Sequence, residues 1–200
     1  MTLVETNMAR VTRHDWLEEG LKAIAEGGFA ALTLDHLLAR LGVTHGSFYH
    51  HFQNRRAYTE ALLAHWTATL TEQVQAETRG IPVLSERVEA LVAKGQALPH
   101  QQALEHAIRS EAANDMLVRR YVEAVDASRL AHCRELARLA CHGSPDADTI
   151  GNLVHAVFVG TQHVLPAFTP AQVTDIYRLM TRLVTEAYAP PGDNTDKEAP

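Results

Sequence analysis

Residues 33–56 read TLDHLLARLGVTHGSFYHHFQNRR and contain two short runs with helical periodicity. Thr33 and Thr44 are good N-cap residues, and each of them precedes one of these runs. Gly42 lies between the runs and permits a sharp turn of the backbone. The stretch therefore predicts two capped helices joined by a tight turn, which is the arrangement of a helix-turn-helix.

The first of these helices has an apolar face and the second packs against it. Four leucines recur at helical spacing in the first run, at positions 34, 37, 38 and 41. In the second run, Phe48 and Phe52 are four residues apart, so they share one face together with Val43. We therefore expect the first helix to be a buried support for the second.

The opposite face of the second helix carries groups that can meet DNA. At about 100° per residue, Gly46, Ser47 and His50 point away from the core, and three further side chains flank them, namely His45, Tyr49 and His51. Hydroxyls, imidazoles and a glycine can closely approach phosphates or base edges in a major groove. Arg55 and Arg56 follow at the start of the next helix, where we expect them to face backbone phosphate.

The run GVTHGSFYHHFQNR, residues 42–55, resembles the N-terminal domain of the TetR family of transcriptional regulators, together with Leu32-Thr33 and the preceding helix that carries Trp16, Leu17, Leu21 and Ile24. The resemblance covers residues 10 to 60. It implies that Thr33 contacts phosphate and that Arg55 takes the place of the family's usual phosphate-binding lysine. It also implies that the recognition helix carries Thr44, His45, Ser47, Tyr49 and His51.

The charge of this region departs from the family pattern. Many relatives have a lysine or arginine near position 45, where this chain has His45. Over residues 1–65, six basic residues face seven acidic ones, so the domain has no basic excess unless its histidines are protonated. A nearby phosphate favours the protonated imidazole. We therefore expect moderately acidic pH to tighten DNA binding.

A simpler interpretation is an ordinary helical hairpin with a solvated polar face. The full spacing of the motif favours the DNA-binding interpretation over this one. At single positions the alternatives stay open, and His50 in particular is as compatible with idle surface as with a DNA contact.

Composition agrees with a globular protein that binds nucleic acid locally. The chain has 200 residues, 46% of them hydrophobic, a formal net charge of −6 and a pI near 6.0. It is therefore not a nonspecific polycation, and any attraction to DNA must come from an oriented surface. We expect a cytoplasmic protein that does not contact the membrane, because no apolar stretch reaches membrane-spanning length and residues 1–7 lack a signal peptide's apolar segment. Cys133 and Cys141 would lie roughly 12 Å apart on one helix, beyond disulfide reach within the chain.

The remaining sequence is helical in pattern, without sustained two-residue alternation, so we predict an all-α protein. Residues 1–56 are predicted to form a three-helix helix-turn-helix domain, with residues 1–10 as a loose arm. Residues 57–189 are predicted to form a helical ligand-binding and dimerisation domain, which begins with a long connecting helix over 56–79. Residues 190–200 are predicted to be a disordered tail.

The last two predicted helices, 146–165 and 170–188, are apolar enough to form an interface. Small residues interleave on the first of them, at Gly151, Ala156 and Gly160. These stripes could simply complete the core of one chain, but the resemblance favours a homodimer in which both chains contribute these helices. A twofold dimer would place two recognition helices on a palindromic operator in double-stranded DNA.

The resemblance also implies a pocket for a small-molecule effector, whose identity the sequence leaves open. Candidate lining residues are polar or aromatic positions on otherwise apolar helices: His106, Glu111, Tyr121, His132, His155, Phe158 and Gln162. Taken alone, each of these residues is more often an ordinary core or surface residue than a ligand contact. An inducer that binds the DNA-incompetent state more tightly would release the DNA.

A histidine-based metalloprotein is the alternative, because the chain has 12 histidines. No two of them are three or four residues apart, and suitable histidine–carboxylate pairs occur only at His14/Glu18 and His132/Glu135. Signatures of a hydrolase nucleophile elbow, a P-loop and a Cys-x-x-Cys site are also lacking. We therefore expect no catalytic residues, no cofactor and no metal site. A metal-sensing regulator, or a helical metal-binding protein or enzyme, stays open because tertiary contacts could assemble ligands from distant helices.

Overall fold

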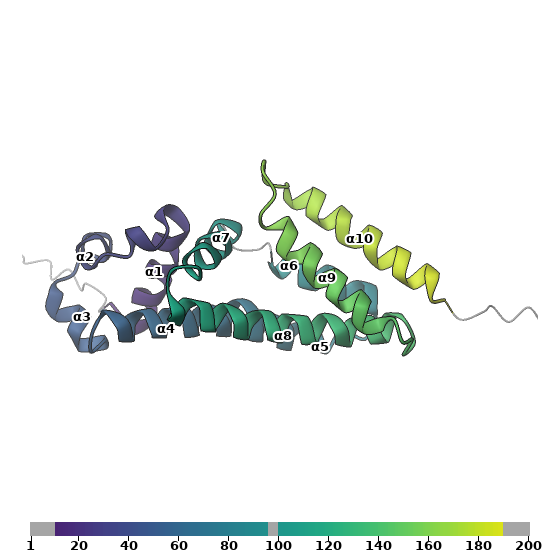
Figure 1. Cartoon of the computed structure of the whole chain (residues 1–200). Coiled ribbons are helices and arrows are strands. Elements are labelled where there is room, and N and C mark those ends of the chain that lie inside the picture. The colour runs from purple at the N-terminus through teal and green to yellow at the C-terminus, as the bar shows by residue number, and fades with distance from the viewer. Residues whose placement is uncertain (1–10, 96–99, 190–200) are drawn as a thin grey trace, which may run out of the picture. The chain divides into compact units, whose positions relative to one another are not determined.

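The computed structural model describes residues 11–95 and 100–189, which form helices and contain no strand (Figure 1). The predicted all-α class is thereby confirmed. The predicted arm over 1–10 and the predicted tail over 190–200 lie outside the described residues. None of the helices in the described ranges has the length and apolarity needed to span a membrane. The chain divides into two compact units.

The first unit combines residues up to Thr67 with Gln102–Tyr121. Its helices are α1 (Arg13–Gly27), α2 (Leu34–Leu41), α3 (His45–His51), α4 (Arg55–Thr67), most of α7 (Gln101–Glu111) and the first residues of α8 (Met116–Ala140), with a short 3₁₀ turn at Phe29–Ala31.

Helix α1 begins with a capping box. The Thr12 hydroxyl accepts a hydrogen bond from the Asp15 backbone at 3.2 Å, and the Asp15 carboxylate accepts one from the Thr12 backbone at 2.7 Å. These bonds satisfy donors that the first turn leaves unpaired. The bonds that the Thr12 backbone and hydroxyl donate to the Asp15 carboxylate lower the pKa of Asp15. The start of α1 is therefore fixed, which sets the position of the side chains that follow.

An aromatic cluster forms the core of this unit and anchors α3. The Trp16 ring is fully buried and packs edge to face on Phe48 and Phe52, with ring centroids 5.4 and 6.4 Å away. The Tyr58 hydroxyl donates to the Trp16 carbonyl at 2.7 Å, and Gly20 leaves the space for it, since a Cβ there would lie 2.2 Å from the Tyr58 oxygen. Helices α1, α3 and α4 are thus tied together around one ring.

The predicted domain boundary after Arg56 differs from the observed division. Helix α4 stays with the first unit because Leu62, Leu63 and Trp66 are fully buried. The predicted single helix over 56–79 is also interrupted, by a π-helical turn at Ala68–Glu72 that leads into α5 (Gln73–Arg79). The second unit begins at this turn.

The second unit contains α5, α6 (Leu84–Gly95), the larger part of α8, α9 (Ala147–Thr161) and α10 (Pro170–Ala187). Gly151 allows α9 to approach α8 closely, since a Cβ there would lie 2.6 Å from the Arg134 Cα. Helix α9 ends four residues before the predicted Leu165, because Pro166 disfavours a helix through the preceding residues. Thr169 caps α10 through a second capping box with Gln172. Cys133 and Cys141 are both free thiols.

Candidate DNA-binding surface and ligand cavity

Helix α3 has one buried face and one exposed face. Gly42 adopts the left-handed conformation at the end of α2, with φ 65°, which permits the tight turn into α3. Phe48 and Phe52 are then 1% and 4% exposed, whereas Tyr49 is 60% exposed. The Tyr49 ring packs edge to face on Phe48, with centroids 5.3 Å apart. Thr44, His45, Gly46 and His50 are also exposed, while Ser47 and His51 are half-buried.

The two predicted N-cap threonines behave differently. The Thr33 hydroxyl accepts a hydrogen bond from the His36 backbone at 3.3 Å, so Thr33 caps α2 as predicted. Thr44 has the extended backbone of an N-cap residue, but its side chain makes no capping hydrogen bond. Both residues are exposed.

Two predicted DNA contacts also hold the domain together. His51 pairs through Nε2 with the Val11 carbonyl at 3.2 Å, and Arg55 donates through Nη2 to the Leu32 carbonyl at 3.1 Å. These bonds fix the backbone just before α1 and just before Thr33. Arg55 is exposed and its guanidinium has five N–H donors, so it retains donors for another partner.

The structure assigns cations to places that the sequence did not indicate. The Arg13 guanidinium lies over the Phe52 ring, 5.2 Å from its centroid, which places a positive charge beside the end of α3. Arg40 instead binds Glu19 and Glu26 of α1, and both carboxylates raise its pKa. His45 lies 3.7 Å from the Asp35 carboxylate. Such cross-helix pairings depend on tertiary packing, so sequence spacing gives no signal for them.

The second unit contains a cavity of about 180 Å³. Its wall is mainly apolar and comes from the π-helical turn, α5, α6, the start of α7, α8, α9 and α10. Its polar side chains are Thr71, Gln75, Gln101, Arg129, His132, His155, Gln162, Tyr177 and Thr181. Of the predicted lining residues, four border it, namely His132, His155, Phe158 and Gln162. His106, Glu111 and Tyr121 do not border it, because they belong to the first unit.

Arg87, His132 and Glu135 form a linked set of side chains, of which His132 lines the cavity. Arg87 is buried and donates to Glu135 Oε1 at 3.1 Å, and His132 Nδ1 lies 3.4 Å from Glu135 Oε2. Burial, with the Arg87 charge, lowers the pKa of His132 below 6.5. Partial burial acts to raise the pKa of Glu135, but the Arg87 hydrogen bond and charge outweigh it and the pKa is lowered. A neutral His132 therefore faces a charged carboxylate.

Arg129 is the second buried arginine that the sequence did not single out. Its Nε donates to the Thr71 hydroxyl at 3.1 Å, and its guanidinium lies 5.1 Å from the centroid of the Phe158 ring. Arginine is usually a surface residue, so composition alone does not place it in a cavity wall.

Helices α9 and α10 leave apolar side chains exposed. Leu153 on α9 is 57% exposed, and Leu179 and Leu183, four apart on α10, are 46% and 55% exposed. Ala156 and Gly160 share the helical face of Leu153, and a Cβ at Gly160 would meet nothing within 4 Å. Exposed apolar faces of this kind mark interaction surfaces.

Comparison with known proteins agrees with this geometry. Residues 17–62, which contain α2 and α3, match the family model described as bacterial regulatory proteins, tetR family. No curated protein matches the chain.

Solved structures of regulators resemble the chain over most of its length. A transcriptional regulator from Rhodococcus sp. Rha1 has 14% identity and a TM-score of 0.71, with 88% of this chain and 97% of that chain covered. Reduced NemR of E. coli has 20% identity and a TM-score of 0.66, with 90% and 100% covered. The ketosteroid transcriptional regulator KstR2 of Mycobacterium tuberculosis has 16% identity and a TM-score of 0.61, with 90% and 95% covered.

At these identities the solved structures show a shared fold, and the family match identifies the domain that contains α3. Together they account for the helix-turn-helix geometry and for the helical unit that follows it. Residues 17–62 thus match the family model of bacterial regulatory proteins of the tetR family, and the chain shares the fold of solved transcriptional regulators over most of its length.

Proposed function

We propose that the chain is a repressor that binds a palindromic operator as a homodimer and that a small-molecule inducer releases it. One observation carries the DNA-binding part of this proposal. Phe48 of α3 and Phe52 at its end are buried, whereas Tyr49 is 60% exposed and Gly46 is exposed as well. A short helix that is packed against the domain on one face and exposed to solvent on the other can insert into a major groove.

The residues around α3 are suited to phosphate rather than to bases. Arg13 and Arg55 are exposed cations fixed by contacts with Phe52 and Leu32, and Thr33 is an exposed hydroxyl at the start of α2. Because these contacts hold the side chains in place, little conformational entropy is lost when they bind. We infer that they set the position of α3 in the groove, while Tyr49 and its neighbours meet base edges.

The exposed apolar faces of α9 and α10 support the homodimer. Leu153, Leu179 and Leu183 would be covered by the same helices of a second chain, and Gly160 would allow close approach. A twofold pair presents two copies of α3, and this symmetry requires a palindromic operator.

The cavity supports a small, mainly apolar inducer. Its volume of about 180 Å³ exceeds the roughly 150 Å³ of a cavity known to hold benzene. His132 Nε2 is buried and has no hydrogen-bond partner among the described residues, while Nδ1 faces the Glu135 carboxylate. A proton on Nδ1 leaves Nε2 as an acceptor. We therefore infer that the inducer carries a hydroxyl or amide donor that reaches His132.

Release follows from differential binding. The inducer shifts the population only if it binds the DNA-incompetent state more tightly than the competent one. A substitution of His132 would therefore change how strongly the inducer binds, and with it how much DNA is released.

Selection of bound fragments from random DNA with the full-length chain tests the proposal. We expect a palindromic sequence that Tyr49→Ala binds roughly 5- to 150-fold more weakly, since a lost base contact costs about 1–3 kcal/mol. Met116→Ala is the matched control, because Met116 is 68% exposed and lies outside α3. Selection of no sequence, or equal loss in both variants, would contradict the proposal. Compounds that release the selected DNA from the wild type are then tested for release of the same DNA from His132→Gln.

A further inference from the structure

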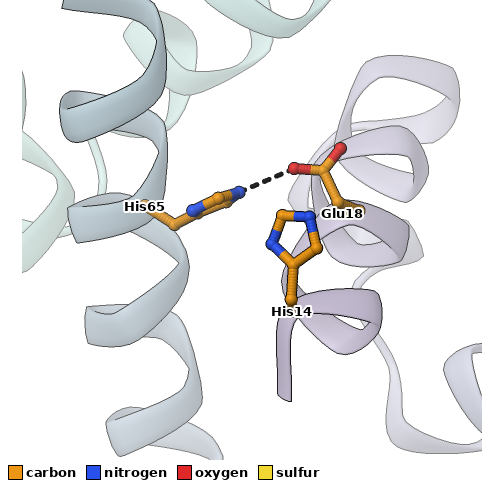
Figure 2. Close-up of side chains that lie close together, drawn as sticks. All are labelled: His14, Glu18 and His65. Atoms are coloured by element: carbon orange, nitrogen blue, oxygen red, sulfur yellow. Dashed lines mark hydrogen bonds and ion pairs between the residues drawn. The ribbon is translucent and has the colours of Figure 1, made fainter. Parts of the chain in front are cut away.

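Three ligand-type side chains meet on one side of the first unit. His14 and Glu18 are one turn apart on α1, and His65 reaches them from α4 (Figure 2). His65 Nε2 lies 2.7 Å from Glu18 Oε1, and the His14 and His65 rings are edge to face with centroids 5.3 Å apart. One ligand atom from each residue lies within 4.8 Å of the others.

The donor set selects the kind of ion. Two imidazoles and one carboxylate suit divalent transition metals, and with three protein ligands a fourth position is left for water. Bonds of about 2.1 Å at tetrahedral angles place ligand atoms roughly 3.4 Å apart. The observed spacing therefore needs only small side-chain rotations, and His14 is exposed and can make them.

The frame that holds these ligands is rigid. His65 is only 17% exposed and its neighbours Leu62, Leu63 and Trp66 are fully buried. Glu18 and His14 lie on either side of Trp16, which the aromatic cluster fixes. His65 is thus fixed by packing, Glu18 is held by its contact with His65, and the exposed His14 can move to close the site.

We propose that His14, Glu18 and His65 bind one divalent transition-metal ion, for which Zn²⁺ is the best match. The ion links α1 to α4 directly beside Trp16, whose ring contacts Phe48 of α3 and Phe52 just after it. The site revises the expectation of no metal, because the sequence supplies only the His14/Glu18 pair and the fold supplies His65. It is independent of the cavity and of the inducer.

Titration of the metal-free full-length chain with Zn²⁺, followed by calorimetry, tests the site. We expect saturable binding that His14→Ala and Glu18→Gln each weaken roughly tenfold or more, since even changes behind a metal ligand cost 10–100-fold. His36→Ala is the control, because His36 is an exposed histidine of the same unit outside the cluster, and it should bind as the wild type does. Saturating Zn²⁺ should also raise Tm by about 5 °C in the wild type and the control.

Two results would contradict the proposed metal site. Wild-type affinity for Zn²⁺ in His14→Ala, or no binding by the wild type, would show that His65 and Glu18 form only an ion pair. His14 is exposed, so His14→Ala should fold, and its Tm without metal checks this. Operator binding is measured separately, so failure of the metal site leaves the proposed DNA-binding function intact.

Discussion

Phe48 and Tyr49 are neighbours in sequence with opposite environments, since one is 1% exposed and the other 60%. The buried ring fixes α3 on Trp16, and the exposed ring rests on the buried one. We therefore expect substitutions at Phe48 to lower stability and substitutions at Tyr49 to lower operator affinity, which unfolding and binding measurements on the same variants would distinguish.

A substitution at Gly46 should separate the effect on folding stability from the effect on DNA binding most clearly. Its missing Cβ would meet only the Thr44 hydroxyl, at 3.8 Å, so Gly46→Ala fits the folded chain. Alanine favours a helix over glycine by about 0.5–1 kcal/mol, and we expect stability to stay equal or rise. Operator affinity should fall, because the added methyl group keeps α3 from the DNA. Urea unfolding and a gel-shift titration check the two effects, and a parallel loss of both would argue against a DNA-facing Gly46.

His132 makes stability depend on pH. Its pKa in the folded chain is lowered below 6.5 by burial and by Arg87 on α6 and Arg79 on α5, against the opposing effect of Glu135 on α8. Below about pH 6.5 the unfolded chain therefore binds more protons, so stability falls as pH drops toward the lowered pKa. We expect the urea midpoint to fall less between about pH 7 and pH 5.5 in His132→Gln than in the wild type. Identical slopes would show that another group titrates in this range.

At the scale of elements, the two glycines of α9 have different surroundings. A Cβ at Gly151 would lie 2.6 Å from the Arg134 Cα, whereas one at Gly160 would meet nothing within 4 Å. Gly151→Ala should therefore force α9 away from α8 and cost about 2 kcal/mol or more. Gly160→Ala should leave the stability of a single chain unchanged or slightly higher. Thermal unfolding of both variants checks the contrast, and equal stabilities would refute the close contact of α8 and α9.

Local patterns predicted the elements well. The leucine spacing of α2, the Thr33 cap and the Gly42 turn are local features, and the structure has all three. The face of α3 followed from the spacing of Phe48 and Phe52.

Features that depend on distant residues could not be predicted. The π-helical turn at Ala68–Glu72, the internal bonds of His51 and Arg55, and the arrival of His65 beside Glu18 all depend on which helices pack together. Buried arginines were missed for the same reason, since their partners Glu135 and Thr71 are 48 and 58 positions away. Helical periodicity in the sequence indicates which face of a helix is apolar, but it does not indicate which other helix packs on that face.

At the scale of the whole molecule, the exposed leucines of α10 test the homodimer. Leu183→Lys places a charge on a face that is already exposed in a single chain, so the chain should fold. A buried unpaired charge costs several kcal/mol, and we expect the dimer to dissociate at concentrations at which the wild type is paired. Light scattering at micromolar concentration measures this. Leu139→Lys is the control, because Leu139 is 54% exposed on α8 and should leave the dimer intact. A monomeric wild type would overturn the arrangement.

The shortness of α3 limits how selective one chain can be in a genome. Seven residues, with Phe48 turned inward, leave side chains for about four base pairs, and a given sequence of that length recurs by chance about once in 256 base pairs. Two such sequences at a fixed separation recur about once in 65,000 base pairs. In the proposed homodimer, selectivity for one operator therefore depends on two chains reading the DNA together. A change that alters the separation of the two α3 helices should remove most of this selectivity without touching a DNA contact.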